Sequence, residues 1–298
     1  MSGIRLGSVF RALVVGGILL SGGVVRGDDG DSVFRGRQLL LRKEYDKAIE
    51  NFNIALKKDA RSSGAYAGRG NAYYLKKDYG AALTDLSRAI ELSPKDAVLL
   101  KDRARVFLAQ GDLDKAIADC DAALKIDSKL AAVYNARGIA YSNKEQVDKA
   151  LNDFNQAIKL DPNFSWPYTN RGNLHRQKND FEKALADFSQ AIKIDPLYAG
   201  HYNNRANVFL DRKELDKALE DYSEAIRLNN RYAQAYNNRG MVYIEKKEYD
   251  KAIADFTEAI RIDPANATAL SHRASALTLK ARQDEEAAQK ILQKKTAP

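Results

Sequence analysis

The sequence predicts an all-α protein built as a solenoid of antiparallel helix pairs stacked one after another. The first observation is a strict period of 34 residues, at which an arginine recurs eight times from Arg35 to Arg273. Two alanine series, beginning at Ala48 and Ala55, keep the same interval. The second observation is that apolar residues follow helical spacing twice within each period. A single helix pair cannot bury its apolar face, so the repeated pairs must stack.

The composition is that of an ordinary folded protein. Of 298 residues, 45% are apolar and 30% are charged, which excludes wholesale disorder. One cysteine excludes a disulfide framework, and with three histidines it leaves little for a Cys/His zinc site. The net charge of +8 is a weak hint about partners.

Residues 1–27 differ from the rest of the chain. Arg5 and Arg11 precede an apolar run at residues 12–25. This run is shorter than the roughly 20 residues that cross a bilayer as a helix. A basic start, a short apolar middle and small residues at the end are typical of an export signal. We expect cleavage after Gly27 and an exported, periplasmic or extracytoplasmic protein. The alternative is an uncleaved membrane anchor, the one case in which we expect contact with a membrane.

Residues 29–266 form seven units without an insertion, and residues 267–298 form a degenerate eighth unit with capping helices. The seven units are residues 29–62, 63–96, 97–130, 131–164, 165–198, 199–232 and 233–266.

The last complete unit shows the pattern of two helices. Tyr236, Gly240 and Tyr243 share one face of the first helix. The second helix carries an apolar stripe of Tyr249, Ala252, Ile253, Phe256, Ala259 and Ile260. Asp263-Pro264 ends it, because the residue before proline is disfavoured in the α region.

The eighth unit begins like the others and then changes character. Leu270, Arg273, Ala274 and Leu277 predict a first helix, but residues 283–295 are strongly charged. A solenoid needs a polar terminal cap, so we expect capping here, with a docking helix as the alternative.

The repeat resembles a known family. The residues that carry the resemblance in the second unit are Tyr66, Arg69, Gly70, Tyr73, Ala82, Leu86, Ala89 and Pro94. Their spacing is similar to that of the tetratricopeptide repeat, although arginine replaces the family's leucine in every unit. The resemblance implies a right-handed superhelix whose first helices line a concave groove that binds proteins or peptides.

The arginines share the packing face, and an aspartate recurs at constant phase. A partly buried guanidinium needs an anion and hydrogen-bond acceptors. We therefore predict a structural ladder of Arg–Asp pairs, within one unit or between neighbours. Its members are Arg69, Arg103, Arg137, Arg171, Arg205, Arg239, Arg273, Asp85, Asp119, Asp153, Asp187, Asp221 and Asp255. The alternative is that the arginines bind a phosphate or acidic ligand.

A second stripe on the first helices varies between units, as a binding surface does. By the resemblance it lines the groove, where asparagines could hydrogen-bond the backbone of an extended peptide. The alternative is that asparagine is simply common at this phase. The candidate residues are Asn71, Tyr74, Lys101, Arg105, Asn135, Trp166, Asn170, Asn173, Asn203, Asn204, Asn207, Asn237 and Asn238.

Trp166 is the best single anchor candidate, since tryptophan is enriched among binding hot spots. Some family members also bind a chain-terminal carboxylate through a clamp over three units. Lys101 and Arg105 match its last part, but Val33, Arg37 and Gly68 stand where the earlier parts belong. We therefore expect the clamp to be incomplete.

We find no pattern for catalysis, a cofactor or a metal. His175, His201 and His272 fall at three repeat phases, and Cys120 lies in the core series of the second helices. There is no phosphate loop and no nucleophile elbow. Interspersed charges make no nucleic-acid stripe.

The sequence therefore predicts a non-catalytic scaffold that binds an extended peptide or helix of a partner protein, with no nucleic acid and no small-molecule substrate. The first alternative is a membrane-anchored assembly scaffold that uses its convex face or edges. The second is the substrate-recognition subunit of an enzyme complex.

Overall fold

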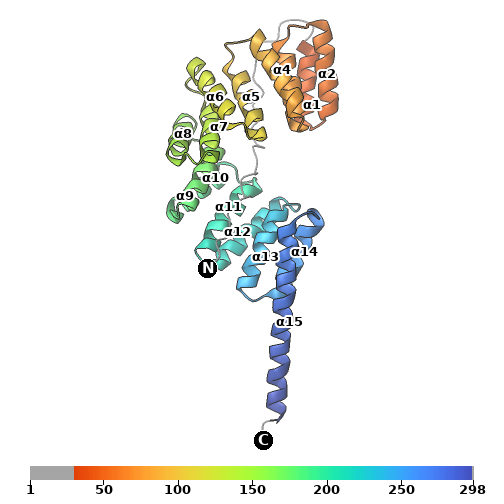
Figure 1. The fold of residues 1–298 in the computed structure, drawn as a ribbon, viewed down its shortest axis with the longest axis vertical. Helices are drawn as coiled ribbons and strands as arrows, with labels where there is room; N and C mark the ends of the chain where they lie inside the picture. Colours follow the sequence, from red (N-terminus) through yellow and green to blue (C-terminus); the bar gives the residue numbers. More distant parts are fainter. Residues whose placement is uncertain (1–29, 297–298) are drawn as a thin grey trace. The chain divides into compact units, whose positions relative to one another are not determined.

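The computed structural model describes residues 30–296, and every regular element in that range is an α-helix (Figure 1). The predicted all-α solenoid of antiparallel helix pairs is confirmed. The predicted export signal, residues 1–27, lies outside the described residues. Among the helices that are described, none is both long enough and apolar enough to span a membrane.

The chain divides into two units, Met1–Pro162 and Asn163–Pro298. In unit 1, each first helix packs against the second helix of its own pair and against the next pair. Its elements are α1 (Gly30–Leu41), α2 (Tyr45–Lys58), α3 (Ser63–Leu75), α4 (Tyr79–Leu92), α5 (Ala97–Gln110), α6 (Leu113–Ile126), α7 (Ala131–Asn143) and α8 (Val147–Leu160).

Unit 2 continues the same packing with three helix pairs and a long final helix. Its elements are α9 (Ser165–Gln177), α10 (Phe181–Ile194), α11 (Ala199–Asp211), α12 (Leu215–Leu228), α13 (Ala233–Glu245), α14 (Tyr249–Ile262) and α15 (Ala267–Thr296).

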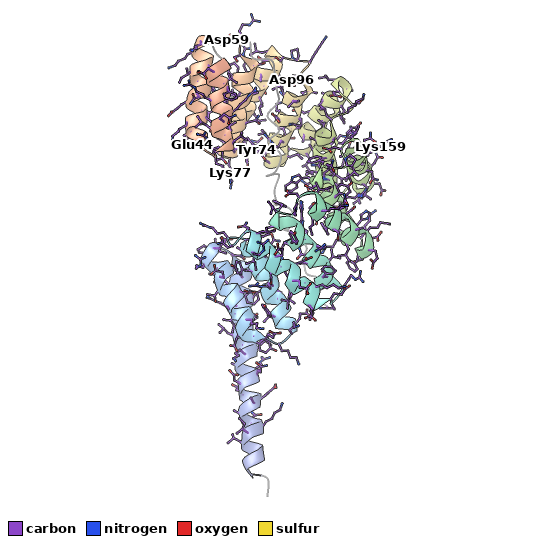
Figure 2. The ribbon with its side chains drawn as sticks, turned by 180° about the vertical axis from the view of Figure 1, so that it is seen from behind. Glu44, Asp59, Tyr74, Lys77, Asp96 and Lys159 are labelled. Carbon is purple, nitrogen blue, oxygen red and sulfur yellow. The ribbon has the colours of Figure 1, made fainter. Side chains whose placement is uncertain are left out.

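The turn inside each pair is built on one residue in the left-handed region. At Lys77, φ is +65°, and the amide of Asp78 bonds back to the carbonyl of Tyr73 at 2.9 Å. The Asp78 side chain then caps α4 by accepting from the amide of Ala81. Figure 2 shows Glu44 and Lys77 at this end of unit 1, and Asp59 and Asp96 at the opposite end. The corresponding left-handed residues are Lys43, Lys77, Gly111, Glu145, Asn179, Lys213 and Lys247.

The core combines small residues with one large side chain from each second helix. The two alanine series are fully buried. Between them on the second helix lies Phe52, Leu86, Cys120, Phe154, Phe188, Tyr222 or Phe256. In five pairs a glycine of the first helix makes room for it: a Cβ on Gly240 would lie 2.7 Å from Cε1 of Phe256. The third and sixth pairs have the buried Ala104 and Ala206 at this position, so the close approach favours a small residue and, beside Phe256, glycine.

The expected C-terminal capping helix is present, but it is continuous with the first helix of the eighth repeat. Instead of a first helix followed by separate capping helices, α15 is one helix of 30 residues whose distal half extends beyond α13 and α14 (Figure 1). Ala281 stands where the other pairs have their left-handed turn residue, and alanine is disfavoured there. Arg282 stands where Asp78 or Asp112 caps the second helix. Five of the other second helices also begin without a side-chain cap, so the helix-favouring alanine at the turn position is the feature by which this junction differs.

Candidate protein-binding surface

The arginines on the first helices and the aspartates on the second helices form bidentate pairs inside the second to seventh repeats. Arg205 donates from Nε and Nη2 to the two carboxylate oxygens of Asp221, at 2.7 and 2.8 Å. The aspartates are buried and the arginine side chains are about one-fifth exposed. The pairs are Arg69–Asp85, Arg103–Asp119, Arg137–Asp153, Arg171–Asp187, Arg205–Asp221 and Arg239–Asp255.

In Arg69, Arg103, Arg137, Arg205 and Arg239, the third guanidinium nitrogen reaches the preceding repeat. Nη1 of Arg205 donates to Oγ of Ser189 at 3.2 Å, and Nη1 of Arg137 donates to Asp121 at 2.6 Å. The equivalent acceptors for Arg69, Arg103 and Arg239 are Asn53, Ser87 and Ser223. The sequence leaves open whether the arginines act within or between repeats, and the structure shows that one guanidinium does both. Because these arginines are already satisfied, the geometry favours a structural role over ligand binding.

The two ends of the arginine series lack this arrangement. Arg35 pairs with the exposed Asp31 on its own helix, because Asn51 stands at the aspartate phase and donates instead to the carbonyl of Lys47. At the other end Arg273 has no aspartate 16 residues later, where the chain has Gln289. The ladder therefore runs from Arg69 to Asp255.

In unit 1, the candidate groove residues of α3 and α5 converge in one polar cluster around Asp102. Nδ2 of Asn71 donates to Asp102 at 3.0 Å, and Nη2 of Arg105 donates to Oδ1 of Asn71 at 2.6 Å. Lys101 lies 3.1 Å from Asp102, and the Arg105 guanidinium lies 4.5 Å from the ring centre of Tyr74. Figure 2 shows Tyr74 on α3 near the turn at Lys77.

Asp102 lies at the centre of this cluster, although helical spacing does not place it among the candidate groove residues. It is buried, which opposes ionisation, but Lys101, Arg105 and the Asn71 amide outweigh this and hold the pKa of Asp102 below its usual value. Asp102 stands at the same position of its repeat as Asn170, Asn204 and Asn238. This shared position is the sequence feature that could have identified it. The carboxylate acts as a built-in counterion for Lys101 and Arg105, so neither cation is free to hold an incoming anion on its own.

In unit 2, asparagines of neighbouring first helices bond to one another. Nδ2 of Asn238 on α13 donates to Oδ1 of Asn203 at 3.2 Å and to Oδ1 of Asn207 at 3.1 Å, both on α11. The Tyr222 hydroxyl donates to the same Asn207 oxygen at 2.6 Å. Asn237 donates to Asn238 at 3.4 Å and lies 2.9 Å from Nδ1 of His272 on α15. These contacts fix the orientation of the amides.

The candidate groove residues differ in how much of them is accessible. Asn71, Asn135 and Asn203 are buried, and Asn203 is only 1% exposed. The remaining candidates are partly exposed: Tyr74, Lys101, Arg105, Trp166, Asn170, Asn173, Asn204, Asn207, Asn237 and Asn238. In the described chain, the amide nitrogens of Asn173, Asn204 and Asn207 donate to no protein group, while the oxygens of Asn204 and Asn207 already accept bonds.

Trp166 does not stand alone on this surface. Its ring centre lies 4.9 Å from that of Tyr198 and 5.9 Å from that of His201. His201 is completely buried, and its Nδ1 lies 2.9 Å from Oγ1 of Thr169 while Nε2 has no partner. Burial lowers the pKa of His201 to about 4, so the imidazole is neutral near pH 7. Trp166 is therefore the accessible edge of an aromatic cluster that joins α9 to α11.

Cys120 and the histidines build no chemical site among the residues that the structure describes. Cys120 is buried, and burial raises the pKa of its thiol to about 12, which makes it inert. Over the same residues, no group of three His, Cys, Asp or Glu side chains could hold a metal ion.

These features define a class of protein, an α-hairpin repeat protein with a polar first-helix surface. The chain belongs to the tetratricopeptide repeat family. The family's sequence profile for the tetratricopeptide repeat matches residues 64–96, 131–164, 165–198 and 233–266. A related profile, the TPR repeat, matches residues 104–145 and 206–246. No curated protein sequence matches the chain.

Solved structures share the fold at low sequence identity. Cut9 in the APC/C heterotetramer Cut9–Hcn1 is 18% identical with a TM-score of 0.73, over 82% of this chain and 48% of that one. Human IFIT1, in a dimer with m7Gppp-AAAA, is 20% identical with a TM-score of 0.71, over 88% of this chain and 65% of that one. A tetratricopeptide repeat protein from Parabacteroides merdae is 16% identical with a TM-score of 0.65, over 84% and 98%. The chain thus spans about half the length of Cut9.

Proposed function

We propose that this protein is a non-catalytic scaffold that binds an extended segment of a partner protein along the first helices of its repeats. Membership of the tetratricopeptide repeat family supports a role in protein–protein interaction. The proposal that the partner lies along the first helices rests on Asn173, Asn204 and Asn207, whose amide nitrogens donate to no protein group in the described chain.

The surface suits a peptide backbone. A main-chain carbonyl accepts hydrogen bonds without regard to side-chain identity, so neutral amide donors favour an extended chain of varied sequence. Because Asn238 and Tyr222 already hold the oxygen of Asn207, its amide nitrogen needs little reorganisation to bind. Trp166 and Met241 are partly exposed on the first helices and supply apolar contact.

The charges of the chain favour a protein partner over RNA. In IFIT1 the same fold occurs with m7Gppp-AAAA, and such a ligand needs unpaired cations for its phosphates. Here Lys101 and Arg105 face Asp102, and the ladder arginines are paired.

The test compares two triple variants of the full chain. We expect Asn173→Ala, Asn204→Ala and Asn207→Ala together to weaken partner capture at least about tenfold, equivalent to about 1.4 kcal/mol. The matched control changes Lys193, Glu220 and Thr257 to Ala; all three are exposed on second helices, and the net charge is conserved. Capture is measured by quantitative crosslinking from a photoreactive residue at Met241. Equal capture by the two variants, or crosslinks to RNA alone, would refute the proposal.

We further propose that the protein is exported. The basic, apolar and small-residue order of residues 1–27 supports this. Intact mass spectrometry of the protein from its native host should give a chain that starts near Asp28. A chain that retains Met1 and sediments with membranes would support the anchor instead.

A further inference from the structure

The first helix of the eighth repeat has an apolar face that nothing in the described chain covers. On α15, Ala269 and Ala276 are buried, the latter beside Phe256 of α14. Leu270 is 42% exposed, Leu277 is 51% exposed, and Ala274 between them is exposed too. These three residues, with Arg273, are called the open face below.

In the preceding repeats, a second helix covers the same face. Tyr236, Gly240 and Tyr243 of α13 hold the positions of Leu270, Ala274 and Leu277, one period of 34 residues earlier. There Gly240 touches Phe256, and Tyr243 packs against the core that contains Ala252 and Phe256 of α14. The open face is therefore half of an interface that the described residues complete seven times and that lacks a covering helix on α15.

The chain's own C-terminal residues cannot complete it. In the register of a second helix, Glu286, Gln289 and Lys290 stand where Ala252, Asp255 and Phe256 stand in α14. These residues instead continue α15 as one helix, in which Ala281 stands at the turn position of the other pairs.

Arg273 indicates that a helix covering the open face must carry a negative charge. Each ladder arginine from Arg69 to Arg239 holds a buried aspartate of the covering helix. Arg273 is partly buried on the open face, and no carboxylate of the described chain pairs with it. A guanidinium enclosed by a docked helix without an anion is costly, so an occupant must supply one. A second copy that docked through the same face would bring another unpaired arginine rather than the missing carboxylate.

We propose that the open face docks an amphipathic helix of a partner protein, one that carries small and large apolar residues on one side and a carboxylate that pairs with Arg273. The partner's helix completes the eighth repeat in trans. This surface is separate from the asparagine surface of the first helices, and it uses the helix-in-groove mode of recognition.

The experiment uses the full chain and a fluorescent peptide copy of residues 246–264, which contains the whole of α14. A lactam bridge on the peptide's polar face holds it helical, because isolated helices of this length are marginal. Fluorescence anisotropy should show saturable binding. The Asp255→Lys peptide should bind at least about tenfold more weakly, and Arg273→Glu in the protein should reverse the preference between the two peptides.

The control variants separate docking from misfolding. Leu277→Glu on the open face should abolish binding, whereas Leu292→Glu, which is 62% exposed near the end of α15, should leave it unchanged. Both variants should keep the wild-type circular dichroism spectrum. The absence of saturable binding, or equal affinity for both peptides, would overturn the proposal. So would sedimentation showing that the chain forms a dimer which Leu277→Glu dissociates, because the occupant would then be a second copy.

Discussion

Five of the ladder arginines each join three helices, since a guanidinium offers hydrogen bonds in a fixed fork. In Arg205, two nitrogens hold Asp221 within the repeat and the third holds Ser189 of the repeat before it. The hydrogen bonds to Asp221 raise the pKa of Arg205 against the effect of burial and keep it charged. The same residue therefore fixes both the geometry of one hairpin and its register on its neighbour.

We predict that the two kinds of bond differ in energy. Asp221→Ala should lower the free energy of unfolding by about 2–4 kcal/mol, because it leaves a largely buried guanidinium without its anion. Ser189→Ala, which removes only the bond between repeats, should cost about 0.5–1 kcal/mol. Urea denaturation measures both. A double-mutant cycle of Arg205→Met with Asp221→Ala that gave negligible coupling would contradict the pairing.

Substitution of glycine by alanine should have opposite effects at two sites. A Cβ on Gly240 would lie 2.7 Å from Phe256, so Gly240→Ala should destabilise the protein by about 1–3 kcal/mol. At Gly80 the nearest atom is Oδ1 of Asp78 at 3.8 Å, so Gly80→Ala should stabilise it by up to about 1 kcal/mol. Thermal unfolding of the two variants checks this, and stabilisation by both would disprove the close packing at Phe256.

Protonation of His201 should weaken the fold in mild acid. Its pKa is lowered from 6.5 to about 4, so between these values the unfolded chain binds a proton that the folded chain does not. Stability is therefore complete above pH 6.5 and falls as the pH drops towards 4, by up to about 3 kcal/mol. Urea midpoints measured by circular dichroism from pH 7 to 5 should fall less steeply for His201→Gln. Parallel slopes would show that His201 is not the group responsible.

At the scale of elements, the boundaries of the hairpins follow from local chemistry. The period, the alanine series and Asp-Pro pairs such as Asp263-Pro264 predict where the helices lie. They do not predict that α15 is continuous, because charged residues such as Glu285 and Lys290 suit either a separate cap or a longer helix. The residue that differs at the turn is Ala281, and the difference is visible only beside the left-handed turn residues of the other repeats.

The surface residues were harder to predict than the helices. Helical spacing places Asn71, Lys101 and Arg105 on one stripe. It does not reveal that Asp102, the next residue after Lys101, contacts them, because a long side chain can reach a neighbour that points to a different side of the helix. Spacing also cannot show that Asn203 is buried by its neighbours, since that depends on how two first helices pack.

Truncation should separate the two halves of α15. Removal of residues 282–298 takes away only exposed side chains in the described part, so the melting temperature should change by less than about 2 °C. Removal of residues 267–298 also deletes Ala276, which covers Phe256, and should lower the melting temperature clearly. Calorimetry distinguishes the two, and equal losses would show that the distal half contributes to packing.

At the scale of the whole molecule, stability is a sum of repeats and of the interfaces between neighbours. A second copy of residues 199–232, inserted after Tyr232, keeps the phase and should give a folded chain with a higher urea midpoint. A half-period insertion of residues 199–215 places a first helix where a second belongs and should lower the midpoint. If the half-period insertion were tolerated equally, the constant phase of the ladder would not govern folding.

The aromatic contact at Trp166 gives this protein a built-in optical reporter. Trp166 is the chain's single tryptophan, and its ring lies 4.9 Å from Tyr198 and 5.9 Å from the ring of His201. Indole emission therefore monitors one junction, between α9 and α11, whereas far-ultraviolet ellipticity averages over every helix. When the two signals are followed in a single denaturant titration, the difference between their midpoints measures how far that junction unfolds independently of the other helices.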